Sequence, residues 1–195
     1  MRVGVLVSGA GTNLQALIDA LHGREIEIAG VISSRPDAAA LARAGAAGIE
    51  RAVFPLAGYA TREEHDEAMA AWLLERGVEL VVLAGYMLLL RPCFLAHFPG
   101  RVVNVHPSLL PAFPGAHAIE DALAAGVDET GVSVFLVDEG VDTGPVLAQA
   151  RVAVHYDDSA EALRARIHAV EHRLLPETVR ALAQGELGAQ GGSGP

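Results

Sequence analysis

The chain has 195 residues, of which 51% are hydrophobic and 19% are charged, and its formal net charge is −10. This length and composition fit one folded domain and exclude a disordered chain. The acidic charge and the lack of any basic run argue against nucleic acid or an anionic membrane as the main partner.

The opening segment and the single cysteine bear on the cellular location of the protein and on the kinds of site it can contain. The first apolar run stops at Val7, which is too short for a signal peptide. No apolar stretch reaches the ~18 residues that are needed to span a bilayer. We therefore expect a cytoplasmic protein. Cys93 alone can form neither an intrachain disulfide nor a cysteine-based zinc site.

In the first half of the chain, short apolar runs alternate with stretches of helical periodicity. Strands are predicted at 2–7, 26–33, 53–54, 79–84 and 101–105. Helices are predicted at 12–21, 37–47, 61–77 and 92–98. Thr61 and Glu64 have the spacing of a capping box at the start of the third helix. The repetition predicts an α/β fold with a mostly parallel, Rossmann-like open sheet that is flanked by helices.

The pattern changes after His106. The Pro-rich stretch 107–117 has no periodicity, so we expect an ordered loop there, followed by a short helix at 118–125. Two β-rich runs, 131–137 and 146–154, are joined by a turn-rich segment. They predict an antiparallel C-terminal extension of the sheet.

The chain closes with a long stretch of helical periodicity over 159–182. Pro176 lies inside it and is expected to kink or divide the helix, because proline cannot donate the backbone hydrogen bond. Residues 1–185 are expected to form a single domain. The Gly-rich remainder, 186–195, is expected to be a disordered tail.

The first candidate for chemistry is the turn SGAGTN at 8–13, between the first strand and the first helix. Glycines let the backbone approach a ligand closely, and a helix N-terminus offers free N–H groups that suit a phosphate. A dinucleotide motif would need glycine in place of Leu14, and no Walker lysine follows. The turn therefore predicts a phosphate monoester site, and the alternative is an ordinary tight turn without a ligand.

The second candidate is the pair Asn104 and His106 at the carboxyl end of the fifth strand. Ligands of open α/β sheets bind at the carboxyl ends of strands, and residues i and i+2 point to the same side. An amide beside an imidazole can stabilise an oxyanion and relay a proton. The alternative for His106 is a structural histidine with satisfied hydrogen bonds.

The third candidate is Asp142, in an acidic turn with Asp138 and Glu139. Such clusters are more often solvated loops than sites. If the chain brings Asp142 back toward His106, its carboxylate would favour the charged imidazolium.

Other reactive side chains give weaker signals. His168 and His172 are four residues apart on the last helix, a spacing that can bind zinc, but no third ligand is evident, and exposed surface histidines are the simpler interpretation. No metal is therefore expected. Neither Ser8 nor Ser108 lies in the G-x-S-x-G pattern of serine hydrolases. Cys93 lies in an apolar stretch and is expected to be buried and inert.

Four segments together resemble the phosphoribosylglycinamide formyltransferases, a folate-dependent family. They read VLVSGAGTNLQALIDA, LAGYM, NVHPSLLPAFPGAHAI and GVSVFLVDEGVDTGPVLAQ. The resemblance runs from about Val3 to the last helix. The NxHPSLLP and DxGP elements are shared with other formyl-folate enzymes, whereas the SGxGTN turn is the more discriminating element.

The resemblance implies roles for particular residues. The catalytic residues would be Asn104, His106 and Asp142. The ribonucleotide substrate would be bound by Gly11, Thr12, Asn13, His168 and Glu171. The folate would be bound by Arg62, Met87, Leu88, Leu89, Leu90, Asn104, Asp138, Glu139, Gly140 and Val141. Relatives often carry arginine where this chain has Leu88 and histidine where it has Phe135. The first change would remove a polar contact to the folate, and the second would affect packing only.

The resemblance also implies the reaction. A formyl group would pass from the co-substrate 10-formyltetrahydrofolate to the amine of N1-(5-phospho-D-ribosyl)glycinamide, in de novo purine biosynthesis. The amine would attack directly, without a metal, and the imidazolium and the amide would stabilise the tetrahedral oxyanion. The expected partners are these small molecules, with neither nucleic acid nor membrane, and the expected assembly is a monomer or a homodimer.

Two other classes of protein remain open. One is another formyl-folate enzyme, either formyltetrahydrofolate deformylase or a methionyl-tRNA formyltransferase-like protein. These usually carry a further regulatory or RNA-binding domain, for which 195 residues leave little room. The other is a non-catalytic nucleotide-binding regulator, which would keep the glycine turn without needing the amide, imidazole and carboxylate together.

Overall fold

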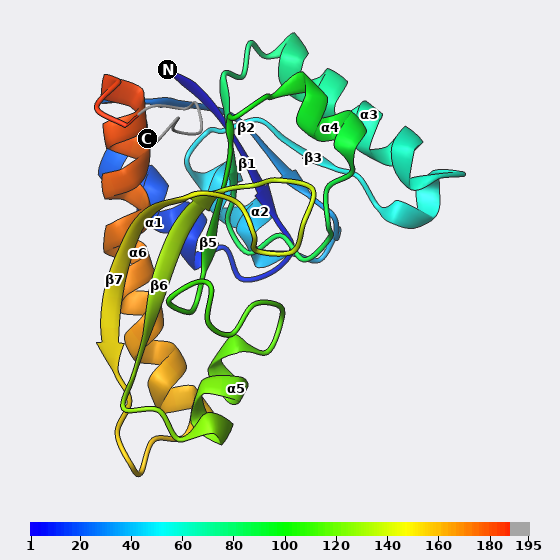
Figure 1. The fold of residues 1–195 in the computed structure, drawn as a ribbon. Helices are drawn as coiled ribbons and strands as arrows, with labels where there is room; N and C mark the ends of the chain where they lie inside the picture. Colours follow the sequence, from blue (N-terminus) through cyan, green and yellow to red (C-terminus); the bar gives the residue numbers. More distant parts are fainter. Residues whose placement is uncertain (188–195) are drawn as a thin grey trace, which may run out of the picture.

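The computed structural model describes residues 1–187 of the chain (Figure 1). The strands in this part are β1 (Arg2–Val7), β2 (Glu27–Ser33), β3 (Arg51–Val53), β4 (Leu80–Leu83), β5 (Val102–His106), β6 (Glu129–Leu136) and β7 (Val146–Ala153). The α-helices are α1 (Thr12–Leu21), α2 (Ala39–Ala46), α3 (Arg62–Glu75), α4 (Pro92–His97), α5 (Ala118–Ala125) and α6 (Ala160–Gln184). A single turn of 3₁₀ helix, η1 (Leu56–Gly58), was not predicted.

The seven strands form one sheet in the order β3-β2-β1-β4-β5-β6-β7. The pairs among β1 to β5 are parallel, and β6 and β7 are antiparallel additions at one edge. The expected fold class, a mostly parallel open sheet with an antiparallel C-terminal extension, is confirmed. Of the tail expected at 186–195, residues 188–195 lie outside the described residues. Leu187, which is described, packs against the core.

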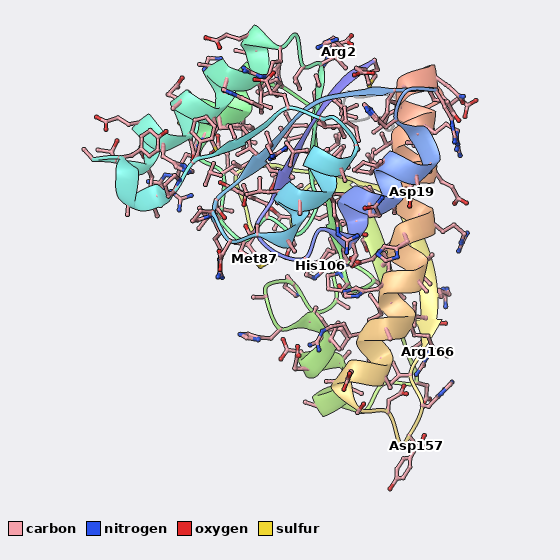
Figure 2. All side chains as sticks on the ribbon, turned by 180° about the vertical axis from the view of Figure 1, so that it is seen from behind. Arg2, Asp19, Met87, His106, Asp157 and Arg166 are labelled. Atoms are coloured by element: carbon pink, nitrogen blue, oxygen red, sulfur yellow. The ribbon has the colours of Figure 1, made fainter. Side chains whose placement is uncertain are left out.

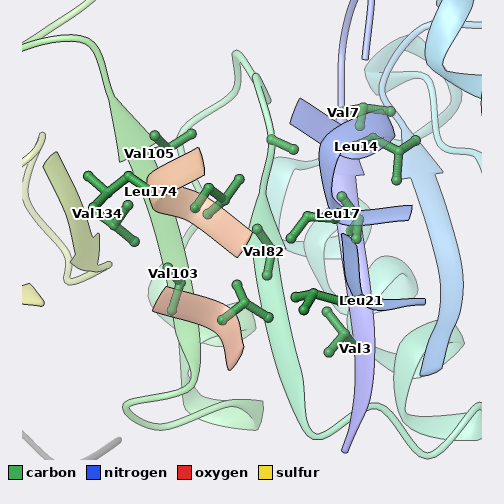
Figure 3. Close-up of a cluster of buried hydrophobic side chains, with 14 of the residues drawn as sticks. Val3, Val7, Leu14, Leu17, Leu21, Val82, Val103, Val105, Val134 and Leu174 are labelled. Atoms are coloured by element: carbon green, nitrogen blue, oxygen red, sulfur yellow. The ribbon is translucent and has the colours of Figure 1, made fainter. Parts of the chain in front are cut away.

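The two faces of the sheet are set by the alternation of side chains along its strands. Val3 and Val5 of β1 belong to the core that α1, α2 and α6 cover, whereas Leu6 belongs to the core under α3 and α4. Figure 3 shows the first of these cores, with the α1 side chains Leu17 and Leu21 packed beside β1. Because the inner strands are buried on both faces, they read as continuous apolar runs in the sequence.

The start of α3 follows the predicted cap with one change. Thr61 is the N-cap, and its hydroxyl accepts the Glu64 N–H at 3.1 Å. The Glu64 carboxylate accepts the N–H of Ala60, one residue earlier than a capping box requires. The Thr61 hydroxyl therefore satisfies one of the free N–H groups of the first turn, that of Glu64.

The last helix is not divided at Pro176. α6 runs without interruption through this residue, so the prediction of a divided helix is wrong. Pro176 is buried between Leu175 and Val179, which belong to the core, so apolar burial offsets the one missing helix bond. Within residues 1–187, no helix combines the length and the apolar character that crossing a membrane requires.

The strand order places a crevice at the end of the sheet. The chain leaves β1 toward β2 and β3 on one side, and it later continues from β4 to β5 on the other side. The connections therefore diverge between β1 and β4, which is the topological switch point where open α/β sheets bind ligands. The segments that follow β1, β4 and β5 all reach this crevice.

The core under α1 and α6 gives a prediction about stability. Leu17 is fully buried, whereas Leu74 on α3 is 43% exposed. We expect Leu17→Ala to lower the free energy of unfolding by about 2–5 kcal/mol, because it removes apolar contacts and leaves a cavity. Leu74→Ala should change it by less than about 0.5 kcal/mol. Urea denaturation of the two variants measures this, and equal losses would contradict the packing described.

Candidate active site

Two adjoining cavities lie at the carboxyl ends of β1, β4 and β5. The first has a volume of about 330 Å³ and the second about 490 Å³. They share a border that includes Gly85, Met87, Pro107 and Ala116. Figure 2 shows Met87 and His106 close together at this end of the sheet.

Most of the residues predicted for the site line these cavities. The first cavity is lined by Met87, Leu88, Leu89, Leu90, Asn104, His106, Gly140, Val141 and Asp142. The second is lined by Gly11, Thr12, Asn13, His168 and Glu171. Arg62, Asp138 and Glu139 are not among the residues that line the first cavity.

The imidazole of His106 lies between two acceptors. Its Nε2 is 2.8 Å from the carbonyl oxygen of Phe113, and its Nδ1 is 3.4 Å from Oδ2 of Asp142. A carbonyl oxygen can only accept, so Nε2 carries a proton. Nδ1 faces the Asp142 carboxylate at ion-pair distance, so an imidazolium with a proton on each nitrogen would lie beside an opposite charge. His106 is 5% exposed, so solvent screens this pair weakly.

Backbone geometry brings these groups together. Phe113 and Asp142 have φ angles of 52° and 55°, in the left-handed region that side chains other than glycine seldom adopt. The Asp142 carboxylate also accepts the N–H of Gly115 at 2.7 Å. Strained residues of this kind persist only where their surroundings fix them, and they concentrate at functional sites.

Asn104 lies beside this pair in the floor of the first cavity. Its Oδ1 accepts the N–H of Val105 at 2.9 Å, which turns the amide so that its NH₂ group remains for donation. The sheet register places Asn104 between Leu83 of β4 and Phe135 of β6, and all three residues line the cavity. Phe135 was expected to affect packing only, so its place in the cavity floor was not foreseen.

The glycine turn after β1 forms one side of the second cavity. Gly11 has φ +72°, and a Cβ there would lie 2.5 Å from the Cβ of Ala40, so both conformation and space require glycine. The Ser8 hydroxyl accepts the N–H of Met87 at 3.0 Å and bonds to Ser34. These bonds tie the turn to the segment after β4.

A buried polar pair lies on the opposite side of the second cavity. Asn13 Nδ2 donates to Oε2 of Glu171 at 2.9 Å. Burial raises the pKa of the Glu171 carboxyl, while the Asn13 bond and the charge of His106 lower it in part. Oδ1 of Asn13 is buried and has no partner among the described residues. A ligand that donates a hydrogen bond would satisfy this oxygen.

The two histidines of α6 are half-buried and stacked on each other, so the expectation of exposed surface histidines is wrong. Their ring centroids are 6.1 Å apart. Burial lowers the pKa of His168 and of His172, which favours the neutral rings. No group of three metal-binding side chains occurs within residues 1–187.

Arg62 and Cys93 also differ from expectation. Arg62 was predicted to bind the folate, but its guanidinium donates to the Leu89 carbonyl at 2.5 Å and so braces a wall of the first cavity. Cys93 is half-buried rather than buried, and desolvation raises the pKa of its thiol, which favours the unreactive protonated form.

The acidic turn is organised by its first residue. Asp138 Oδ1 accepts the Gly140 N–H at 3.0 Å and the Thr143 hydroxyl at 2.7 Å. Asp138 therefore shapes the loop that carries Asp142, while Glu139 is exposed.

Several site groups had no signal in the sequence. They are backbone atoms of Phe113 and Gly115 and the cavity-lining side chains of Leu83 and Tyr86. Every residue has a backbone carbonyl and nearly every residue an N–H, so a sequence pattern does not mark which of them belong to a site. The glycine in FPGA was the one visible hint of a special conformation.

This geometry supports acyl transfer. A cavity with an apolar rim holds an imidazole, a carboxylate and an amide, and a neighbouring cavity offers a glycine turn at the start of a helix. Residues 1–179 match the formyl transferase family model. The chain therefore belongs to the formyl transferase family, whose enzymes use a formyl-folate co-substrate.

Within that family the chain is similar to phosphoribosylglycinamide formyltransferases. It is 41% identical to the one from Haemophilus influenzae, over 95% of this chain and 89% of that protein. It is 43% identical to the one from Mycobacterium tuberculosis (strain ATCC 25618 / H37Rv), over 93% of this chain and 85% of that protein. The chain is also 44% identical to the trifunctional purine biosynthetic protein adenosine-3 of Chironomus tentans, where the match covers 94% of this chain but only 14% of that protein.

A solved structure agrees with these matches. The glycinamide ribonucleotide transformylase 1 of Symbiobacterium toebii has a TM-score of 0.94 and 48% sequence identity to this chain. The match covers 98% of this chain and 91% of that one. The resemblance inferred from the sequence motifs is confirmed.

The buried carboxyl of Glu171 gives a prediction about pH. The pKa of this carboxyl is higher in the folded protein than in the unfolded chain. The carboxyl therefore contributes fully to stability below its unfolded-state pKa of about 4.3, and this contribution is lost as pH rises through its folded-state pKa. Glu171→Gln keeps an acceptor for Asn13 and does not titrate. Relative to the wild type, the Glu171→Gln variant should therefore become more stable, measured as the free energy of unfolding, as pH rises from about 4 to 7.

Glu50 provides a control in which stability should change with pH in the opposite direction, because the hydrogen bond to Arg76 lowers the pKa of Glu50. Glu50→Gln should lose stability relative to the wild type as pH rises. Urea unfolding across this pH range measures both variants, and a flat difference for Glu171→Gln would show that the carboxyl is not buried as described.

Proposed function

We propose that this protein transfers the formyl group of 10-formyltetrahydrofolate to the amine of N1-(5-phospho-D-ribosyl)glycinamide, a step of de novo purine biosynthesis. The observation that carries the proposal is the position of the pair His106 and Asp142, beside Asn104, in the first cavity and next to Pro107 on its border with the second. Each cavity can hold one of the two substrates. Cytoplasmic location follows from this pathway as part of the proposal, and the choice between monomer and homodimer stays a prediction.

The second cavity takes the ribonucleotide. The N–H groups at Gly11, Thr12 and Asn13 receive the phosphate at the start of α1, where the helix dipole favours an anion. His168 and Glu171 on α6 receive the ribose and the glycinamide. The unpartnered Oδ1 of Asn13 supports this placement, because the glycinamide carries N–H donors.

The first cavity takes the folate. Its apolar lining by Leu88, Leu90 and Phe135 suits the flat rings, and the loop residues Gly140 and Val141 close over one side. Leu88 offers no polar contact at a position where relatives often have arginine, so the folate here is held by shape and backbone groups. Asp138 and Glu139 act through the conformation of this loop, and Arg62 acts through the wall that it braces.

The reaction needs a charged donor beside the formyl carbon. The substrate amine attacks this carbon, a C–N bond forms, and the carbonyl oxygen becomes an oxyanion. The His106 imidazolium and the Asn104 amide donate to that oxygen. Collapse of the intermediate breaks the bond to N10 of the folate, which takes up a proton, while the attacking nitrogen loses one. Asp142 holds His106 charged and oriented throughout.

The carbonyl of Phe113 now accepts the bond from His106 Nε2. The oxygen of this carbonyl therefore occupies the position in which an acceptor contacts the imidazolium. For an oxyanion to take that place, the Phe113 carbonyl has to move aside, and the left-handed φ of 52° at this residue lowers the cost of such a change.

The other candidate functions are less well supported. A deformylase would use water in place of the amine and would have no need of the second cavity. A methionyl-tRNA formyltransferase-like protein would need a surface for RNA, which a net charge of −10 opposes. A non-catalytic regulator would not need a buried imidazole flanked by acceptors.

The direct test is an assay with the purified chain, glycinamide ribonucleotide and 10-formyltetrahydrofolate, with product formation followed by mass spectrometry. We expect stoichiometric formyl transfer to the ribonucleotide. Release of formate without transfer would favour the deformylase, and no consumption of the folate would favour the regulator.

The assignment of the catalytic residues makes a separate prediction. We expect His106→Ala and Asn104→Ala each to lower kcat by about 10²–10³-fold, as the loss of one oxyanion donor does elsewhere. For Asp142 the informative change is Asp142→Asn, because asparagine tolerates the positive φ at this position whereas alanine would add strain. The same loss is expected, since the amide cannot hold the imidazolium charged. His155→Ala alters an exposed histidine and should leave kcat unchanged.

Circular dichroism checks that each variant is folded before its kinetics are compared. Wild-type turnover in His106→Ala would remove this histidine from the mechanism.

A further inference from the structure

Three side chains of α3 face one wall of the first cavity. Arg62, Asp66 and Met69 are spaced by four and three residues, so they lie along one side of the helix. Each of them contacts the segment 86–91, which follows β4 and supplies much of the lining of that cavity. Figure 1 shows α3 beside α4, the helix that follows this segment in the chain.

Two of these contacts hold the middle and the start of this segment. Arg62 donates to the Leu89 carbonyl from a half-exposed position. The Tyr86 hydroxyl donates to Met69 Sδ at 3.4 Å, and sulfur is a weak acceptor. Burial raises the pKa of the Tyr86 hydroxyl, which keeps it protonated as a donor.

The third contact involves two fully buried polar side chains. Oδ2 of Asp66 accepts the backbone N–H of Arg91 at 2.8 Å, and its Oδ1 is 2.7 Å from Nδ1 of His65. Nε2 of His65 is 3.0 Å from the carbonyl oxygen of Phe54. His65 and Asp66 are both 0% exposed.

A buried carboxylate costs free energy unless hydrogen bonds satisfy it. Asp66 has two such partners, the His65 ring and the Arg91 N–H, so the wall itself supplies one of the bonds that this carboxylate needs. Asp66 therefore holds the end of the wall from a fully buried position, whereas Arg62 holds its middle from a half-exposed one.

The wall needs such an anchor because much of it does not pack into the core. Met87 is 72% exposed and Leu89 is 46% exposed, whereas Leu90 is buried. Hydrogen bonds at Met87 N–H, the Leu89 carbonyl and Arg91 N–H hold the exposed part of the wall, in addition to the core packing of Leu90.

We propose that Asp66 is a positioning residue for the folate co-substrate: its buried carboxylate, held by His65, fixes the backbone at Arg91 and thereby the shape of the first cavity. Asp66 touches no substrate. The inference rests on the proposed function, because it takes the first cavity as the folate site.

Three variants test this in the full chain. Asp66→Ala removes both bonds and should raise KM for 10-formyltetrahydrofolate about tenfold, with kcat and KM for the ribonucleotide within about twofold of the wild type. Asp66→Asn keeps an oxygen that can accept the Arg91 N–H, so KM for the folate should stay within about threefold. Glu63→Gln is the matched control, because Glu63 lies on the same helix and pairs with the exposed guanidinium of Arg91. It should change neither KM.

Amide hydrogen exchange of residues 86–91 in the free protein separates this proposal from the proposed function, since it needs no substrate. We expect exchange at least about tenfold faster in Asp66→Ala than in the wild type and in Asp66→Asn. Unchanged exchange, or a KM for the folate equal to that of Glu63→Gln, would overturn the proposal. If Asp66→Ala does not fold, hydrogen exchange at the Arg91 amide of the wild type tests the proposal instead. Exchange there at the rate of a free amide would exclude the bond to Asp66 and overturn the proposal. A wild-type chain without formyl transfer would defeat the proposed function but leave the exchange result valid.

Discussion

The site depends on one side chain that fastens two loops to the end of a strand. His106 closes β5, and its two ring nitrogens meet the carbonyl of Phe113 and the carboxylate of Asp142. Asp142 in turn accepts the N–H of Gly115, so the loops on both sides of the first cavity are joined through a single imidazole. Nε2 meets the Phe113 carbonyl, and Nδ1 faces the Asp142 carboxylate at 3.4 Å, so a proton on Nδ1 would place opposite charges side by side. The charged form of the ring, which the proposed reaction uses, therefore fits both neighbours.

An imidazole between a carboxylate and a carbonyl occurs a second time, at His65, where the partners are Asp66 and the carbonyl of Phe54. The two pairs differ in what surrounds them. His106 borders a cavity, where the proposed reaction replaces its carbonyl partner with a ligand, whereas His65 is fully buried. The two proposals thus give the same arrangement of acceptors a chemical role where a cavity adjoins it and a positioning role where none does.

Periodicity predicted the elements well because the inner strands are buried on both faces and the helices on one. The i+2 spacing also placed Asn104 and His106 at one cavity. Asp142 was a candidate from its acidic turn, but its catalytic role beside His106 was implied by the family resemblance, since a helix and a β-strand separate the two residues and no local pattern encodes that return. Arg62 was assigned to the ligand because a sequence cannot tell a side chain that lines a cavity from one behind its wall. The pair His65 and Asp66 gave no signal, because adjacent polar residues on a helix normally face water.

The net charge of −10 raises the question of how such a protein binds an anionic ribonucleotide. At physiological ionic strength charges more than about 8 Å apart are largely screened, so the immediate surroundings of the second cavity decide. These include the start of α1, the carboxyl of Glu171 and the cation Arg164, which is paired with Glu120. Burial raises the pKa of the Glu171 carboxyl, and the more of its proton it keeps, the less it repels a phosphate. The burial of Glu171 therefore reduces the local repulsion of an anion, and the start of α1 supplies the attraction.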